Sequence, residues 1–252
     1  MIEILILSVI QGITEFIPVS SSSHLILVSE FLKFNNQSLS IDVSLHIGSF
    51  LAVIFFFKKD IFDFVQNKDL FLKIIVSSLP VMIVGFFLVN FNLIDQLRNM
   101  KMIGLTTLIF GILLYISDSF ETKHKIKKKF NYKSAIIIGA LQVLSLIPGV
   151  SRSGISITAA RFLKFERVES AKISFLLSIP TLAAVSIYGL FNLTSNENLN
   201  FSLINVLSII LSFFFSLITI KFFLNFLKKF SLKIFVIYRI FIGAVIILIA
   251  YL

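Results

Sequence analysis

Two short polar stretches interrupt an otherwise apolar chain, and the first carries the residue types of an acid–base or metal site. It runs Gln11-Gly12-Ile13-Thr14-Glu15-Phe16-Ile17-Pro18-Val19-Ser20-Ser21-Ser22-Ser23-His24. Gln11 and Glu15 are four residues apart, so they share one face of a helix that Pro18 can end. A charged side chain in apolar sequence costs about 2.5–3.5 kcal/mol on insertion scales. We therefore expect Glu15, close to four hydroxyls and an imidazole, to serve a function rather than to lie in water at an interface.

The second stretch carries the parts of an oxyanion site. It reads Pro148-Gly149-Val150-Ser151-Arg152-Ser153-Gly154 and precedes a predicted helix. Gly149 and Gly154 let the backbone approach a ligand closely, and the amides and dipole of a helix N-terminus favour an anion. Arg152 offers a planar cation that fits phosphate oxygens. The spacing is not that of a Walker loop; the simpler alternative is that Arg152 reaches a lipid headgroup and the glycines only pack helices.

The elements that must position these residues are membrane helices. The 252 residues are 57% hydrophobic and 14% charged, with a mean hydropathy of +0.99, whereas soluble domains are roughly 25% charged. Lipid can cover such an apolar surface and water cannot. The net charge of +10 does not indicate nucleic-acid binding, because the lysines cluster between apolar runs, as in loops that face anionic lipid. Without cysteine there is no disulfide or thiolate metal site, and the N-terminus does not resemble a cleaved signal peptide.

Length and hydropathy predict about six spanning helices. They are expected at about 43–57, 74–94, 102–117, 173–196, 198–220 and 234–252. The two polar stretches lie within apolar segments 4–29 and 134–165, each broken in its middle by residues that end helices. Irregular backbone at membrane depth persists only where protein or a wet cavity covers it. We therefore expect both segments to be re-entrant, entering and leaving the membrane on the same side.

The distribution of basic residues predicts the orientation. With both termini outside, the inner loops carry 17 Lys and Arg and the outer loops carry 3, as the positive-inside rule requires. The expected fold is an all-α integral membrane protein with one transmembrane domain, 1–252. Its two inverted repeats, 1–118 and 134–252, are joined by a basic cytoplasmic loop, 119–133. Inverted repeats with broken helices place a polar site near the midplane, where the repeats meet.

At the two polar stretches the chain resembles the BacA/UppP family of undecaprenyl-diphosphate phosphatases. Fainter similarity at His46-Ile47-Gly48-Ser49, Pro80, Pro180 and Tyr238-Arg239 extends the resemblance through nearly the whole chain. The resemblance implies a bacterial plasma-membrane enzyme that hydrolyses undecaprenyl diphosphate to the monophosphate and phosphate. That reaction recycles the carrier lipid for cell-wall synthesis and is linked to bacitracin resistance. The resemblance also implies a divalent metal and a site that opens to the outer face. The functional residues that it carries over are Gln11, Glu15, Ser21, His24, Ser151 and Arg152.

Two positions in the first stretch bear on how closely the chain follows the family pattern. Gln11, which the pattern allows, removes one possible anionic metal ligand. Ser23 stands where the family usually has glycine, and glycine adopts a positive φ more readily than serine. The turn before His24 is therefore the part of the motif where this chain departs from the family pattern.

We expect the diphosphate to lie between the two re-entrant tips, with Glu15 and Gln11 holding Mg²⁺ or Ca²⁺. The residues expected to bind the diphosphate are Ser20, Ser22, Gly149, Ser151, Arg152, Ser153 and Gly154. The nucleophile stays open between Ser21 with His24 as its base, His24 itself, and an activated water.

Other functions fit parts of the pattern. A secondary transporter or a flippase for an anionic lipid or substrate would also have inverted repeats and broken helices, and a lipid-binding structural subunit is a third possibility. Asp42 and His46, four residues apart, could bind a metal or relay protons, although such a pair at a helix end more often stabilises the helix locally. The expected partners are undecaprenyl diphosphate and the lipid bilayer, with no nucleic acid; a homodimer is left open.

Overall fold

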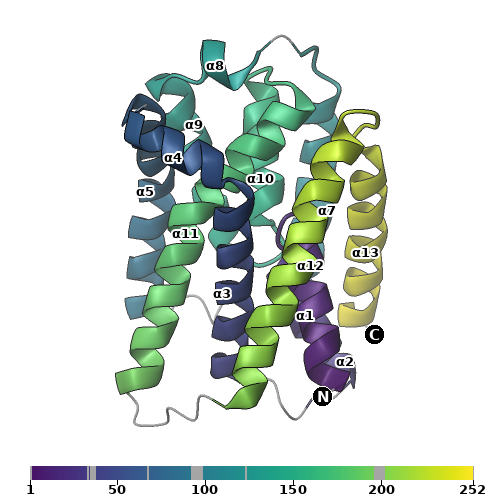
Figure 1. The fold of residues 1–252 in the computed structure, drawn as a ribbon. Coiled ribbons are helices and arrows are strands. Elements are labelled where there is room, and N and C mark those ends of the chain that lie inside the picture. The colour runs from purple at the N-terminus through teal and green to yellow at the C-terminus, as the bar shows by residue number, and fades with distance from the viewer. Residues whose placement is uncertain are drawn as a thin grey trace.

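The chain folds into a bundle of helices (Figure 1). The computed structural model describes residues 2–32, 34, 38–66, 68–91, 99–122, 124–195 and 202–251. Within these residues, six helices are long and apolar enough to cross a membrane. They are α3 (Leu39–Phe56), α5 (Lys68–Asn90), α7 (Met100–Asp118), α11 (Arg167–Ser195), α12 (Leu203–Leu227) and α13 (Lys233–Tyr251). The prediction of an all-α membrane protein with about six spans is confirmed.

The helix bounds differ from the predicted spans mainly in register. Helix α12 runs from Leu203 to Leu227 rather than from 198 to 220, because Ser202 forms a capping box with Asn205 at its start. Helix α5 begins at Lys68, six residues before the predicted span, with Asp69 in its first turn. The predicted residues 92–94, 196 and 198–201 lie outside the described part of the chain, as do parts of the predicted outer loops.

Helix α12 illustrates why these helices pack closely in lipid. Phe214, Ile218 and Phe222 are more than half exposed, whereas serines at a spacing of four line the opposite, buried face. Two of these serines, at positions 212 and 216, each place their Oγ 3.1 Å from Oγ of Ser49 on α3. Small residues of this kind let two backbones approach each other and bond across a membrane interface. The packing of α12 on α3 therefore follows from a serine stripe rather than from a large apolar face.

Two helical hairpins enter the bundle from opposite ends (Figure 1). The first consists of α1 (Ile2–Thr14) and α2 (Ser21–Leu32); the second consists of α9 (Tyr132–Gln142), the 3₁₀ turn η1 (Val143–Leu146) and α10 (Arg152–Phe162). Helix α1 packs on α12, and α9 packs on α5. In each case a glycine allows the contact: a Cβ on Gly12 would lie 2.5 Å from Cβ of Phe215, and one on Gly139 would lie 2.5 Å from the carbonyl oxygen of Ser77. Both hairpins are thus held by close backbone contact with a spanning helix of the other half.

The turn of each hairpin ends in a serine with a left-handed backbone. Ser20 has a φ of 77° and Ser151 a φ of 71°, and a helix begins immediately after each. Ser23, which stands where the family usually has glycine, lies within α2, and its hydroxyl is 2.9 Å from that of Ser20. The correspondence of the turns is compatible with an inverted repeat. The repeat bounds 1–118 and 134–252 stay a prediction.

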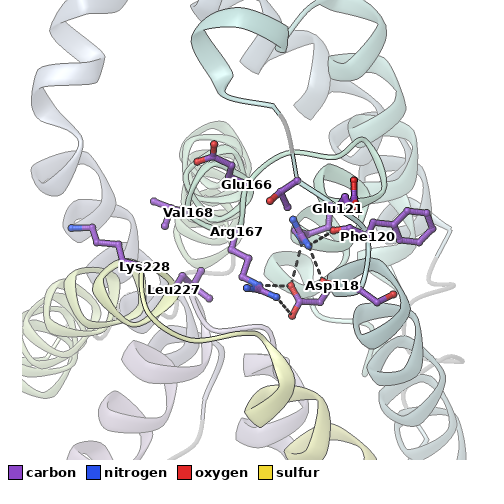
Figure 2. Close-up of a pocket in the computed structure, with 11 residues that line it drawn as sticks. Asp118, Phe120, Glu121, Glu166, Arg167, Val168, Leu227 and Lys228 are labelled. Atoms are coloured by element: carbon purple, nitrogen blue, oxygen red, sulfur yellow. Dashed lines mark hydrogen bonds and ion pairs between the residues drawn. The ribbon is translucent and has the colours of Figure 1, made fainter.

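A separate polar network closes the end of the bundle that carries the lysine-rich loop, where α7 and α12 end (Figure 2). The buried carboxylate of Asp118 accepts from Nε and Nη2 of Arg167 at 2.7 and 3.1 Å and lies 3.3 Å from Nε of Arg161. It also accepts from the backbone amide of Leu232, just before α13. One carboxylate therefore ties together α7, α10, α11 and the start of α13. In the described part of the chain, the short helices α4 (Lys58–Gln66) and α8 (Ile126–Lys129) also lie at this end.

Candidate functional site

A cavity of about 210 Å³ lies between the two hairpin turns. It brings together residues from both predicted polar stretches. Those that line it are Thr14, Glu15, Ser20, Ser21, Ser22, Ser151, Arg152 and Ser153. A larger cavity, of about 680 Å³, surrounds the Asp118 network (Figure 2), and none of the predicted site residues lines it. The smaller cavity is therefore the candidate site.

Glu15 is the centre of the polar contacts in this site. It follows directly after α1, and its amide bonds to the carbonyl of Gln11, which extends the helix by one residue. Nη2 of Arg152 donates to Oε1 of Glu15 at 2.7 Å, and the hydroxyl of Ser21 donates to Oε2 at 2.7 Å. Gln11 donates to the same Oε2 at 3.1 Å. The first residues of α2 and α10 thus converge on one carboxylate.

Backbone carbonyls hold the two turns together. Ser153, at the start of α10 just after the second turn, donates its hydroxyl to the carbonyl of Ile17 in the first turn at 2.8 Å. Arg239, fully buried on α13, donates to the carbonyls of Pro18 at 3.3 Å and Gly149 at 2.9 Å. A buried guanidinium is costly unless its donors are used, and here it bonds both turns at once. The relative position of the two halves of the site is therefore fixed by α13.

Two helix N-termini meet at the cavity. The first residues of α2 and of α10, Ser21 and Arg152, both line it. The first amides of a helix have no acceptor within the helix, and the helix dipole places partial positive charge there. In α10 one of these amides, that of Gly154, is already capped by the hydroxyl of Ser151 at 3.1 Å. The remaining amides, the hydroxyls and Arg152 together suit a ligand rich in anionic oxygens.

Four predicted residues do not line the cavity. One is Gln11, which contacts Glu15 from α1, and the other three are Gly149, Gly154 and His24. Gly149, with a φ of 91°, packs against α7, where a Cβ would meet the threonine hydroxyl of Thr106 at 2.1 Å, and Gly154 lies against Arg239. His24 lies 2.7 Å through Nδ1 from the carbonyl of Ser20 and 2.6 Å through Nε2 from the hydroxyl of Tyr238. Because a carbonyl only accepts, Nδ1 carries a proton, and in the neutral ring Nε2 accepts from Tyr238. The ring of His24 is thus engaged away from Ser21, and its predicted role as a base stays a prediction.

His46 belongs to the candidate site although its sequence signal is weak. It lies on α3 and lines the cavity, and its Nδ1 is 3.0 Å from Nε2 of Gln11. The chain of contacts therefore runs from Ser21 through Glu15 and Gln11 to His46. The available signal was the weak motif that begins at His46, but nothing in the spacing along the chain joined it to Gln11, 35 residues earlier. Ser145 and Thr181 also line the cavity and had no signal.

The oxygen donors at Glu15 fit a divalent cation that takes most of its ligands from a substrate. Within the described residues there is no group of three or more His, Asp and Glu side chains that could hold a metal. Mg²⁺ is commonly bound through one or two carboxylates and substrate phosphates rather than in an all-protein cage. The side-chain oxygen of Gln11 is buried and has no hydrogen-bond partner, so an amide oxygen is available next to Glu15.

Comparison with known proteins points to one family. The family described as "Bacitracin resistance protein BacA" matches residues 4–245. The chain is 47% identical to the undecaprenyl-diphosphatase of Pelagibacter ubique (strain HTCC1062) over 99% of its own length and 98% of the relative. It is 40% identical to the undecaprenyl-diphosphatase of Saccharophagus degradans over 94% of both chains. It is 36% identical to that of a Jannaschia species over 98% of its own length and 97% of the relative.

Proposed function

We propose that this chain, which belongs to the bacitracin resistance protein BacA family, hydrolyses undecaprenyl diphosphate to undecaprenyl phosphate and inorganic phosphate. The carrier lipid released in this way would return to cell-wall synthesis. The observation that carries the proposal is the convergence of Ser21 and Arg152 on the carboxylate of Glu15, at 2.7 Å each, inside a cavity lined by hydroxyls. A hydroxyl, a base and a cation in contact are the parts that phosphoryl transfer needs.

Ser21 is the nucleophile in this proposal, with Glu15 as the base that receives its proton. The hydroxyl oxygen attacks the terminal phosphorus, the bond from that phosphorus to the bridging oxygen breaks, and undecaprenyl phosphate leaves. Water then attacks the phosphoserine, which releases inorganic phosphate and restores the hydroxyl. Arg152 and the first amides of α2 and α10 stabilise the charge on the transferred group. The contact of Ser21 with Glu15 favours this carboxylate over His24, whose ring nitrogens bond elsewhere.

The proposal includes a divalent cation, Mg²⁺ or Ca²⁺, held by Glu15 and Gln11. When bound, it would neutralise charge between the two phosphates and so ease departure of the lipid phosphate. The single carboxylate and the unpartnered amide oxygen support this assignment.

Phosphate release in detergent tests the activity itself. Purified protein is given farnesyl or undecaprenyl diphosphate, and free phosphate is measured. Detergent removes the separate compartments that transport requires but leaves hydrolysis possible, so release separates a phosphatase from a transporter or flippase. Absence of release by wild-type protein, with added Mg²⁺ or Ca²⁺, would contradict the proposed function.

Trapping the covalent intermediate tests the nucleophile. Acid quenching after a brief reaction with substrate labelled in its terminal phosphate should leave label on the wild-type protein. Ser21→Ala should carry none, whereas Ser22→Ala, which removes the neighbouring hydroxyl in the same cavity, should still be labelled. Equal labelling of both variants would exclude Ser21. In a parallel alkaline quench, which preserves phosphohistidine, labelling lost only in His24→Ala would transfer the role to that residue.

The proposed site opens to the outer face of a bacterial plasma membrane, with both termini outside. The excess of Lys and Arg in the loops at one end of the bundle supports this orientation. The chain contains no cysteine, so single cysteines can report the topology. Leu203→Cys should react with an impermeant maleimide in intact cells, and Thr122→Cys should react only after lysis. A homodimer is left open, and light scattering of the solubilised protein would measure the oligomeric state.

A further inference from the structure

We propose that the isoprenoid tail of the substrate lies in an apolar groove between α5 and α11, which makes these two helices the determinant of tail specificity. The inference rests on the proposed function and extends it from the diphosphate to the lipid. It places the tail between α5 and α11 rather than between any other pair of helices near the site.

The groove has a volume of about 390 Å³. Its walls are almost entirely apolar. They are formed by Val81, Met82, Gly85, Phe86 and Val89 of α5, Leu146 at the end of η1, and Thr181, Ala184, Val185 and Tyr188 of α11. Val81 is buried, whereas Phe86, Val185 and Tyr188 are between 40% and 59% exposed. The groove therefore has a buried floor and a rim that faces the lipid.

The groove is continuous with the polar cavity. Thr181 and Val185 line both. At the next point of contact, Ser145 lines the polar cavity and its neighbour Leu146 lines the groove. The hydroxyl of Thr181 donates to carbonyls of its own helix, with oxygen distances of 3.1 Å to Leu177 and 3.2 Å to Ser178. The wall at the junction thus changes from polar to apolar over one helical turn. A lipid diphosphate makes the same change where its diphosphate joins the first isoprene unit.

The groove also lies on the side from which a lipid can arrive. It covers the halves of α5 and α11 that follow Pro80 and Pro180. These halves run toward the end of the bundle opposite the lysine-rich loop, which is the predicted outer end (Figure 1). An outer-leaflet lipid could therefore place its diphosphate at Glu15 and Arg152 while its tail stays within the apolar layer.

The size of the groove limits how much of the tail it can contact. A volume near 390 Å³ is at the small end of the range of about 300–1,000 Å³ for pockets that hold drug-sized ligands. An undecaprenyl chain is much longer than such a ligand, so its distal part must lie in the bilayer. We therefore expect the enzyme to recognise the first isoprene units and to distinguish poorly between longer tails.

Filling the groove tests the inference. Ala184→Phe places an aromatic ring in the groove, and phosphate release is measured with isopentenyl, farnesyl and undecaprenyl diphosphate. The KM for the two long substrates should rise by roughly tenfold, because the tail must push the new ring aside to enter the groove. The kcat/KM for isopentenyl diphosphate should change less than about twofold. Ala244→Phe, the same replacement on the exposed face of α13, should leave all three substrates unaffected.

Two results would overturn the tail assignment. One is an equal change for all three substrates in Ala184→Phe, and the other is no change for any of them. Inactive wild-type protein is a different outcome, because it removes the proposed function and the groove assignment together. If Ala184→Phe does not fold, a farnesyl diphosphate analogue with a photoreactive terminal unit can be cross-linked to wild-type protein. Cross-links are expected at 81–89 and 184–188, and cross-links confined to α2 or α13 would place the tail elsewhere.

Discussion

The guanidinium of Arg152 lies 2.7 Å from the carboxylate of Glu15, a residue 137 positions earlier in the chain. Both side chains are largely buried, with exposures of 15% and 6%. The attraction within a buried ion pair often fails to offset the cost of removing both charges from water. Such a pair is weak support for stability, and its place in a hydroxyl-lined cavity supports the proposed role of both charges in binding the substrate.

The same pair predicts that diphosphate binding depends on a cation. A diphosphate at Arg152 brings negative oxygens close to Glu15, and like charges repel strongly where water is excluded. Binding of a non-hydrolysable farnesyl diphosphonate to wild-type protein should therefore weaken when EDTA removes divalent metal. In Glu15→Gln the repulsion is absent, so the loss on adding EDTA should be smaller. Calorimetry measures both affinities without relying on turnover; equal EDTA sensitivity in the two proteins would contradict the prediction.

Removal of the Arg152 side chain should reduce catalysis far more than it reduces folding. Loss of one preorganised donor to a developing charge costs about 10²–10³ in kcat, so a decrease of this order is expected for Arg152→Ala in the phosphate-release assay. Arg152→Lys keeps the charge but loses the paired donors of the planar guanidinium, so it should recover only part of the activity. Lys101→Ala is the matched control, because it removes a positive charge at the start of α7, where Lys101 stacks over Tyr251. A similar loss in the control would mean that net charge, rather than the site, matters.

Arg239 should support catalysis by holding the two turns in position, without contacting the substrate. Arg239→Met keeps an unbranched but shorter side chain and removes the guanidinium donors to the carbonyls of Pro18 and Gly149. The Gly149 carbonyl then keeps only the hydroxyl of Thr107, at 3.4 Å. A buried polar group left unsatisfied costs about 1–3 kcal/mol, and a displacement near 1 Å at a reacting centre can reduce the rate by about 10²-fold. We expect a lower unfolding temperature in detergent and a reduced kcat in the protein that remains folded. Recovery of kcat in Arg239→Lys, which can restore one of the bonds, would support positioning; a variant with normal kcat and lower stability would show a structural role alone.

Asp118 should affect stability without affecting the chemistry. Removing one partner of a buried ion pair costs about 3–5 kcal/mol, and Asp118→Asn weakens the contacts with both Arg161 and Arg167. Its cavity shares no residue with the site, so the specific activity of folded protein should be unchanged. Asp69→Asn, at an exposed carboxylate that pairs with Lys73 one helical turn away, should alter stability by less than about 0.5 kcal/mol. A fall in the kcat of folded Asp118→Asn would instead indicate coupling between the two ends of the bundle.

Local composition was sufficient to predict the membrane class, the approximate spans and the two polar turns. Apolar runs of spanning length, and breaks made by Pro18 and by Pro148 with Gly149, are properties of neighbouring residues, and each has few structural solutions in lipid. The same locality explains why the helix bounds were displaced. Ser202 caps the start of α12. A cap contributes about 1 kcal/mol, and the apolar run that predicted the span continues across it.

The contacts between elements could not be read from spacing along the chain. His46 reaches Gln11 because α3 packs on α12 through a serine stripe and α1 packs on α12 through Gly12. His24 faces Tyr238 instead of Ser21, and Arg239 joins the two turns, because of how α13 lies against both. A residue's type and neighbours determine what it can bond. Which partner it meets depends on the face that its helix presents to another, and that face is selected by close packing over the whole bundle.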